Sequence, residues 1–197
     1  LHAKLTDQQR AELGGELKAG ASTSLLYWLA CQHQLPQQAT PLGLGEYVWS
    51  RLCDAAPAVE RTNALGALNL TTSDWHHAAF AALDLPQLQW PRLASPAEPI
   101  GTLSIGGHQL PCFPPLGDHQ CALLGTRLEA GELSLNISTG SQVSHLSNQL
   151  KLGNYQTRTY FDGQFLNSIT HLPAGRSLDV LVGLVNQLAQ DVSPNHD

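Results

Sequence analysis

The chain has 197 residues, of which 42% are hydrophobic and 13% are charged, so it can form one domain or two small ones around a buried core. Ten basic and sixteen acidic residues give a net charge of −6, which argues against a nucleic-acid partner. No apolar run approaches the length of a membrane span, and the N-terminus does not resemble a leader peptide. We therefore expect a soluble, cytoplasmic protein that does not bind membranes.

The four cysteines are scattered, which excludes a recognisable zinc ribbon or redox motif, and free buried thiols are expected. The histidine spacing likewise predicts no metal site made of protein ligands. The sequence contains no methionine and begins Leu1-His2-Ala3-Lys4, so we expect it to be an internal fragment of a longer protein.

The first quarter of the chain predicts helices separated by loops. One helical turn is expected over residues 8–13. Ser and Thr ahead of apolar positions predict a capped helix from Ser22 to about Gln34, and helical spacing predicts another from Leu44 to Cys53. Aromatic side chains bury large areas, so we expect the aromatics of these helices to be core residues rather than a sugar-stacking platform. They are Tyr27, Trp28 and Trp49.

The middle of the chain is richer in loops. Residues 55–71 predict a loop-rich segment, and a helix is expected from Ser73 to Leu83, capped by Ser73 or Asp74. A proline-rich connector from Pro86 to Pro99 follows. A strand then begins near Ile100, and Gly106-Gly107 predicts the turn of a hairpin.

A short helix is predicted where the next extended segment ends. Residues 110–116 lead to Gly117, Asp118 opens the helix, and Gly125 closes it. On its own, Asp118 is typical of a helix cap, which binds free backbone N–H groups and is kept ionised by the helix dipole.

A hairpin is predicted directly after this helix. Alternating residues predict one strand over 132–137 and another over 142–146, with Ser138-Thr139-Gly140-Ser141 between them. Such a tip offers backbone N–H groups and hydroxyls to an anion such as phosphate. The same residue types also form ordinary tight turns, so the tip alone does not decide between the two interpretations.

The last part of the chain predicts two strands and a helix. The strands cover residues 155–160 and 164–169, with a turn at Asp162-Gly163. An apolar helix is expected from Gly175 to Gln190. Free N–H groups at its start could bind an anion, although an ordinary helix start has the same sequence.

Two of these segments together resemble a known family. The run Gly117–Gly125 resembles the stretch that carries the catalytic aspartate in FGGY-type carbohydrate kinases, and Asn136–Gln142 resembles the second phosphate loop of that family. Their order and spacing agree, and Asn-Ile-Ser-Thr is most similar to the sedoheptulokinase branch. The resemblance extends from about Ser22 to Val185.

The resemblance implies a partial α/β fold of the ribonuclease-H-like (actin-like) sugar kinase type. Residues 1–121 would be the C-terminal part of the N-terminal, sugar-binding domain. Residues 122–197 would begin the C-terminal, nucleotide-binding domain.

The implied reaction is transfer of the γ-phosphoryl group of ATP, with Mg²⁺, to a sugar hydroxyl, such as one of the ketose sedoheptulose. Asp118 would be the general base and would contact the sugar together with His119. In the loop 61–67 the family carries a carboxylate that this chain lacks, and Asn63 is the remaining polar candidate for a sugar contact. The residues expected to contact the nucleotide are Ser138, Thr139, Gly140, Gly175 and Asp179.

Two functional classes remain open. One is a segment of an active carbohydrate kinase, and the other is a non-catalytic sugar- or nucleotide-binding remnant of the same fold. The family's N-terminal Asp-x-Gly-Thr phosphate loop and its later adenosine-binding segment are not found in this sequence. Missing strands would leave apolar sheet surface uncovered, so a homodimer or a complementary segment is expected.

Overall fold

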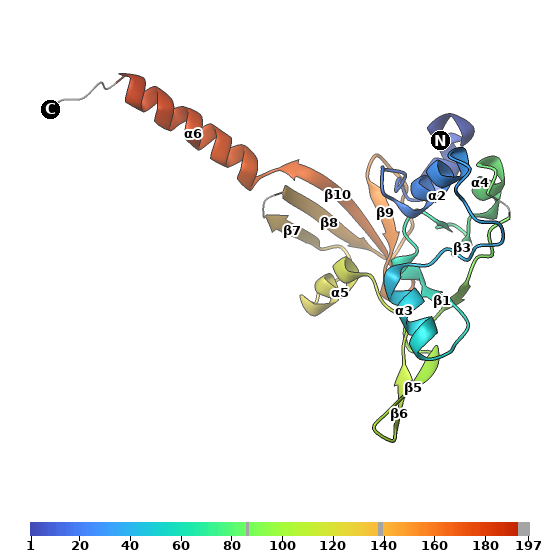
Figure 1. The fold of residues 1–197 in the computed structure, drawn as a ribbon. Coiled ribbons are helices and arrows are strands. Elements are labelled where there is room, and N and C mark those ends of the chain that lie inside the picture. The colour runs from blue at the N-terminus through green and yellow to red at the C-terminus, as the bar shows by residue number, and fades with distance from the viewer. Residues whose placement is uncertain (86, 138–139, 193–197) are drawn as a thin grey trace.

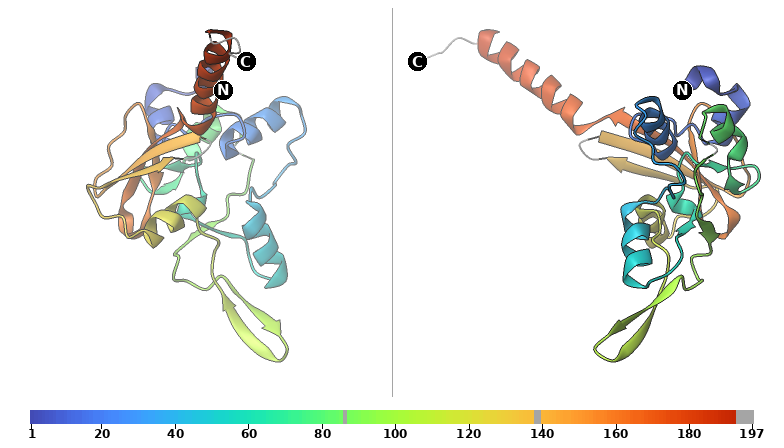
Figure 2. Two further views of the ribbon diagram at one scale, coloured as in Figure 1. Left: turned by 90° about the vertical axis from the view of Figure 1, so that its left-hand side faces the viewer. Right: turned by 45° about the vertical axis from the view of Figure 1, so that its right-hand side comes forward.

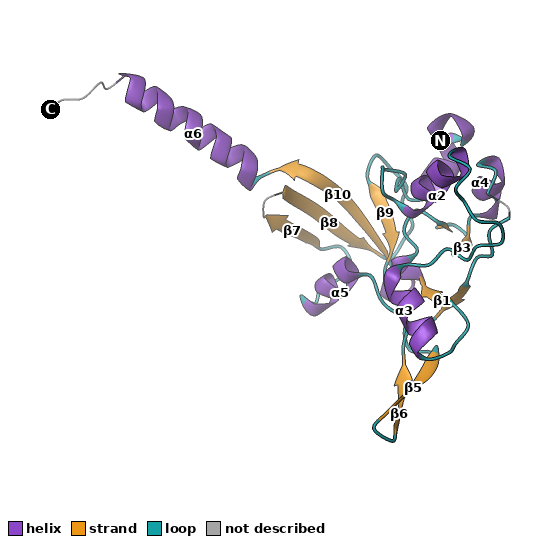
Figure 3. Cartoon of the chain, in the orientation of Figure 1, coloured by secondary structure: helices purple, strands orange, loops and turns teal. Residues whose placement is uncertain are grey.

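The computed structural model describes residues 1–85, 87–137 and 140–192. It has a helical N-terminal part, a projecting hairpin, a four-stranded sheet and a long terminal helix (Figure 1). The helices of the N-terminal part are η1 (His2–Lys4), α1 (Asp7–Glu12), α2 (Ser22–Cys31), α3 (Leu44–Leu52), η2 (Arg61–Asn63) and α4 (His77–Ala82). Figure 3 shows the same elements by type, with loops occupying much of this part.

A cluster of apolar side chains forms the core of the N-terminal part. It joins Leu13, which directly follows α1, to Phe80 of α4 and to Leu85 shortly after α4. The ring of Phe80 stacks on Trp90 with centroids 4.0 Å apart, and Trp75 lies 4.8 Å from Trp90. Such aromatic pairs contribute packing and quadrupole interactions beyond their buried area.

Short strands surround this core. The strand β1 (Ala58–Glu60) pairs in parallel with β4 (Arg92–Ala94), and β2 (Leu68–Asn69) pairs antiparallel with β3 (Asp74–Trp75). The hairpin of β5 (Gly101–Ile105) and β6 (His108–Cys112) projects from the body (Figure 2). The chain then passes from this hairpin into α5 (Asp118–Gly125).

An antiparallel sheet forms the C-terminal part, in the order β7-β8-β10-β9. Its strands are β7 (Leu133–Ile137), β8 (Gly140–Ser147), β9 (Gln156–Thr159) and β10 (Phe165–Pro173), and η3 (Phe161–Gly163) lies between the last two. Side chains alternate between the two faces of a strand, so the register assigns each residue to one face.

One face of the sheet packs against α5. Leu146 and Leu166 are fully buried there and form a small core with Leu123 of α5 and with Tyr160. The Ser144 and Ser168 hydroxyls, also buried on this face, lie 2.8 Å apart.

The opposite face of the sheet carries exposed apolar side chains. Along β7 these are Leu133, Leu135 and Ile137, with 68%, 59% and 70% of their surface exposed. The helix α6 (Gly175–Val192) extends from β10 away from the sheet (Figures 1 and 2). None of the described helices is long and apolar enough to cross a membrane.

The structure confirms most of the predicted elements, and the differences have physical causes. The helix expected from Ser73 is shorter, because Asp74-Trp75 pairs with β2, and His76 caps it instead of Ser73 or Asp74. The core assignment of Trp28 is wrong, since 53% of this residue is exposed. All four cysteines are free, as expected, but only Cys112 is buried, since Cys31 is exposed and Cys53 and Cys121 are half-buried.

Candidate functional site

The start of α5 is fixed against η2 by buried hydrogen bonds. The Gly117 N–H donates to the Thr62 hydroxyl at 2.9 Å, and the Gln120 amide donates to the carbonyls of Thr62 and Thr159 at 3.3 and 3.2 Å. A larger residue at position 117 would force its neighbours to shift, because an added Cβ would contact the Gln120 side-chain oxygen and lie 2.9 Å from the Thr62 carbonyl oxygen. The first turn of α5 therefore has a defined position relative to the N-terminal part.

A buried carboxylate supports this anchor. Glu60 accepts hydrogen bonds from the backbone N–H of Thr62, at 2.8 Å, and from the Thr62 hydroxyl. Residues 61–67 themselves contain no carboxylate, and Glu60 lies immediately before them. Both of these hydrogen bonds are made with Thr62, so the Glu60 carboxylate orients Thr62 and has a structural role.

Asp118 occupies the first helical position of α5. Gly117 is the N-cap residue and, having no side chain, makes no side-chain cap. The interpretation of Asp118 as the N-cap is therefore wrong. Its Oδ1 accepts from the N–H of His119 at 2.6 Å, and the residue is otherwise exposed. An exposed carboxylate held at a fixed helix start can accept a proton from a bound hydroxyl.

His119 connects α5 to the sheet. Its Nδ1 lies 3.4 Å from Nη1 of Arg158, and its Nε2 lies 2.7 Å from the Gln142 amide nitrogen. The roles of the two ring nitrogens depend on the tautomer: Nε2 accepts from the Gln142 amide nitrogen when Nδ1 carries the proton, and Nδ1 can accept from Arg158 when Nε2 carries it. Burial, and then the Arg158 charge, lower the pKa of His119, against an opposing effect of the Asp118 carboxylate.

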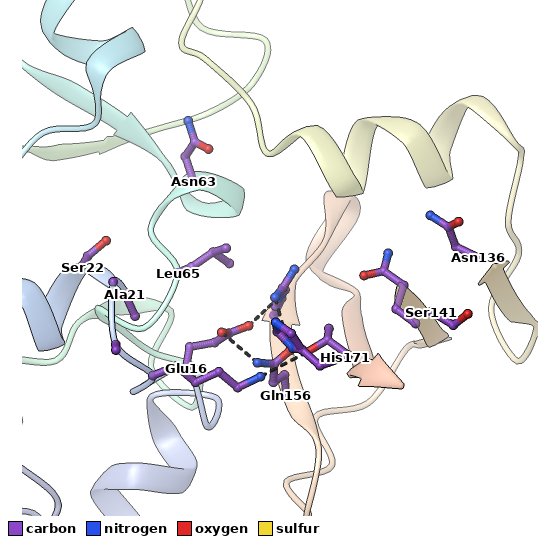
Figure 4. A pocket seen from close by; sticks show the side chains of 15 residues that line it. Glu16, Ala21, Ser22, Asn63, Leu65, Asn136, Ser141, Gln156 and His171 are labelled. Carbon is purple, nitrogen blue, oxygen red and sulfur yellow. Dashed lines mark hydrogen bonds and ion pairs between the residues drawn. The ribbon is translucent and has the colours of Figure 1, made fainter. Parts of the chain in front are cut away.

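A polar cleft of about 650 Å³ lies between the N-terminal part and the sheet. One wall carries Glu16, Ser22 and Asn63, and Ser141 and Asn136 lie across from it (Figure 4). The complete lining is Glu16, Lys18, Ala19, Gly20, Ala21, Ser22, Asn63, Leu65, Asn136, Ser141, Gln142, Gln156, Arg158, Thr170 and His171.

A hydrogen-bonded network crosses the cleft and ties its two walls together. The Glu16 carboxylate accepts from Nε of Arg158 at 2.5 Å and from the Gln156 amide at 3.2 Å. Both partners of the ion pair are largely buried, with 9% and 15% of their side chains exposed. The Lys18 ammonium donates to the Thr170 hydroxyl at 3.1 Å.

The structure brings some of the expected site residues to this cleft. Asn63 lines it and donates to the buried Glu46 carboxylate at 2.7 Å. Asp118 and His119 do not line it, but His119 contacts Gln142 and Arg158, which do.

Of the expected nucleotide contacts, the structure describes Gly140, Gly175 and Asp179. Ser138 and Thr139 are outside the described residues. Gly140 begins β8 and pairs with Pro173, two residues before Gly175 opens α6, so Gly140 and the helix start lie at the same end of the sheet. Asp179 is exposed on α6, away from the cleft lining.

Sequence reasoning missed Glu16, Lys18, Gln156, Arg158 and His171. Gln156 and Arg158 alternate on one strand, so a period of two could have assigned them to the same face. Glu16 and Lys18 carried no such signal, because they lie in a loop and their partners are about 140 and 150 residues away in sequence.

Comparison with known proteins gives matches at the level of structure. No protein-family model and no curated protein matches the sequence. The chain superposes on the xylulose kinase from Rhodospirillum rubrum with a TM-score of 0.77 and 18% identity, covering 96% of this chain and 42% of that one. For the Plasmodium falciparum glycerol kinase with ADP, the TM-score is 0.75 at 16% identity, covering 94% of this chain and 41% of that one. For the Bifidobacterium adolescentis xylulose kinase, the TM-score is 0.75 at 15% identity, covering 91% of this chain and 43% of that one.

The chain therefore has the α/β sugar kinase fold of the actin-like ATPase type, and it spans about two fifths of the length of these kinases. This confirms the fold class expected from the sequence.

Proposed function

We propose that this chain is part of an ATP-dependent carbohydrate kinase of the FGGY type. The carrying observation is the contact of His119 with Gln142. It connects the start of α5, which bears the exposed Asp118 carboxylate, to the hairpin whose tip is the candidate phosphate loop. Phosphoryl transfer to a hydroxyl requires a base and phosphate-binding donors within reach of one substrate, and His119, next to Asp118, contacts two residues that line the cleft.

The proposed roles follow from this arrangement. Asp118 accepts the proton of the attacking hydroxyl, and His119 positions the sugar beside it. Ser138, Thr139 and Gly140 donate hydrogen bonds to the transferring phosphoryl group, where negative charge must be stabilised. Gly175 and Asp179 contact the nucleotide from the first turns of α6. The proposed domain boundary lies at residue 121, within α5.

ATP with Mg²⁺ supplies the phosphoryl group. Among the described residues no group of three His, Cys, Asp or Glu side chains could hold a metal ion. Mg²⁺ in phosphoryl-transfer sites commonly takes most of its ligands from phosphates and water. In the proposed kinase, the nucleotide phosphates and water would hold most of the coordination positions of this ion.

The acceptor that we propose is a sugar, more specifically a ketose such as sedoheptulose. The cleft volume of about 650 Å³ lies in the range of small-molecule sites, and amide side chains such as Asn63, Gln142 and Gln156 can donate to and accept from hydroxyls. The sedoheptulokinase assignment rests on the sequence resemblance of the hairpin tip.

The test, on a complete protein built around this segment, is ATP-dependent phosphorylation of a panel of ketoses and glycerol, measured as ADP release. We expect Asp118→Asn to lower turnover about 10²–10⁴-fold, the usual effect of removing a general base. The control is Asp162→Asn, the same change at an exposed turn residue, which should leave turnover unchanged. Sugar binding without any turnover would instead favour the non-catalytic remnant of the fold.

A further inference from the structure

The charge of the cleft is opposite to that of the whole chain. Its described lining carries two permanent cations, Lys18 and Arg158, and one carboxylate, Glu16, so its formal charge is 2 − 1 = +1, compared with −6 for the chain. The Arg158–Glu16 ion pair neutralises itself. Lys18 makes no ion pair within the described part of the chain, and its ammonium is thus available to an anionic ligand.

Lys18 does not stand alone. Its Nζ lies 3.1 Å from the Thr170 hydroxyl, which is in turn 2.8 Å from Nδ1 of His171. Lys18 comes from the loop before α2, and the other two residues come from β10, so two separate parts of the fold supply the group. All three residues line the cleft.

The backbone at His171 is shaped to present this side chain. The register of β10 with β8 shifts between Ile169 and Leu172, and His171 has a φ of +61°, in the left-handed region. Bulges of this kind re-aim side chains and are over-represented beside active sites. A non-glycine residue with positive φ costs free energy that is commonly retained where function needs it.

The location of this group is also specific. Beyond the bulge, Leu172 pairs with Ser141 and Pro173 with Gly140, so His171 lies next to the base of the hairpin tip. In the proposed kinase this is the end of the cleft that the transferring phosphoryl group must reach.

We propose that Lys18 and His171, with the Thr170 hydroxyl between them, form an anion subsite at the hairpin end of the cleft that binds a compact oxyanion. The oxyanion is either the phosphoryl group in transfer or an acidic group on the sugar. Both offer oxygens that accept charge-assisted hydrogen bonds. This inference rests on the proposed function only in taking the cleft to be the substrate site.

The test is direct binding of inorganic phosphate and of gluconate to the isotope-labelled chain, at fixed pH and ionic strength without nucleotide or metal. The readout is the backbone amide resonances of Thr170 and His171. We expect Lys18→Gln to weaken binding about tenfold or more, as loss of a charge-assisted hydrogen bond does. His171→Asn, which tolerates the left-handed backbone, should also weaken it. Lys151→Gln, which removes an exposed lysine that does not line the cleft, is the matched control.

Each outcome decides the proposal. Phosphate binding that depends on Lys18 supports a phosphoryl subsite, and gluconate binding alone supports an acidic sugar. The subsite is overturned if neither ligand shifts these resonances, or if Lys151→Gln weakens binding as much as Lys18→Gln. If binding depends on Lys18 but the protein phosphorylates no sugar, the anion subsite is supported and the proposed kinase activity is refuted. Turnover in a protein that binds neither phosphate nor gluconate at Lys18 would support the proposed kinase activity and refute the anion subsite.

Discussion

The ion pair between Glu16 and Arg158 provides a sharp test of how the cleft is held together. We expect Glu16→Gln to destabilise the chain strongly, because it leaves the Arg158 guanidinium largely buried without its counter-charge. The Gln156 amide, which donates to the other Glu16 oxygen at 3.2 Å, would also lose a charged partner. Removing one member of a buried pair typically costs about 3–5 kcal/mol.

The chain contains a matched exposed pair, Arg92–Glu98, whose side chains are 44% and 48% exposed. Glu98→Gln should cost only about 0–1 kcal/mol, since solvent screens an exposed pair. The assay is urea unfolding of both variants, compared as midpoint and slope. Equal losses of free energy of unfolding in the two variants would refute the reasoning that burial makes the Glu16–Arg158 pair important.

Three further predictions concern the start of α5 and the N-terminal core. Gly117→Ala should cost roughly 1–3 kcal/mol in urea unfolding, because its Cβ would crowd the Thr62 carbonyl, whereas Gly125→Ala, with open space around it, should not destabilise. Thr62→Val removes the acceptor of the Gly117 N–H and should cost roughly 1–3 kcal/mol, compared with little for exposed Thr102→Val. Burial lowers the pKa of His76, outweighing Glu12, whose Oε2 lies 3.0 Å from Nε2 but outside hydrogen-bond geometry. As the pH falls, His76 therefore takes up a proton at a higher pH in the unfolded chain than in the folded chain. The contribution of His76 to stability should be full above about pH 6.5 and should fall as the pH drops below that value. A pH dependence that is the same in His76→Gln would contradict this.

Local sequence patterns predicted the elements that carry the candidate site. The glycines at 117 and 125 delimit α5 within one residue, and alternation located both strands of the hairpin at 133–147. These patterns worked because backbone conformation there depends on neighbouring residues: a helix start, a C-terminal glycine and a period of two. The resemblance of the same segments to kinases then gave the fold class.

The cleft could not be predicted in the same way, because its contacts are non-local. Glu16 lies in a loop with no periodic pattern, and nothing near it in sequence indicates that its partner is Arg158. Non-local contacts also explain why α4 is shorter than predicted, because Trp75, which was expected in this helix, pairs with Leu68 in a strand instead. The fixed position of Asp118 likewise depends on Thr62, whose hydroxyl contacts Gly117 only in the folded chain.

The uncovered apolar surface bears on the partner expected from the sequence. Leu135 and Ile169 both lie opposite Val143, so one apolar row crosses three strands on the sheet face that α5 does not cover. The helix α6 adds exposed Leu181 and Val185. Contiguous apolar surface of this kind generally marks an interface. Because the matched kinases are more than twice as long as this chain, their additional length could cover such a face. A homodimer and a complementary segment, the two partners expected from the sequence, would each cover this face, and both stay predictions.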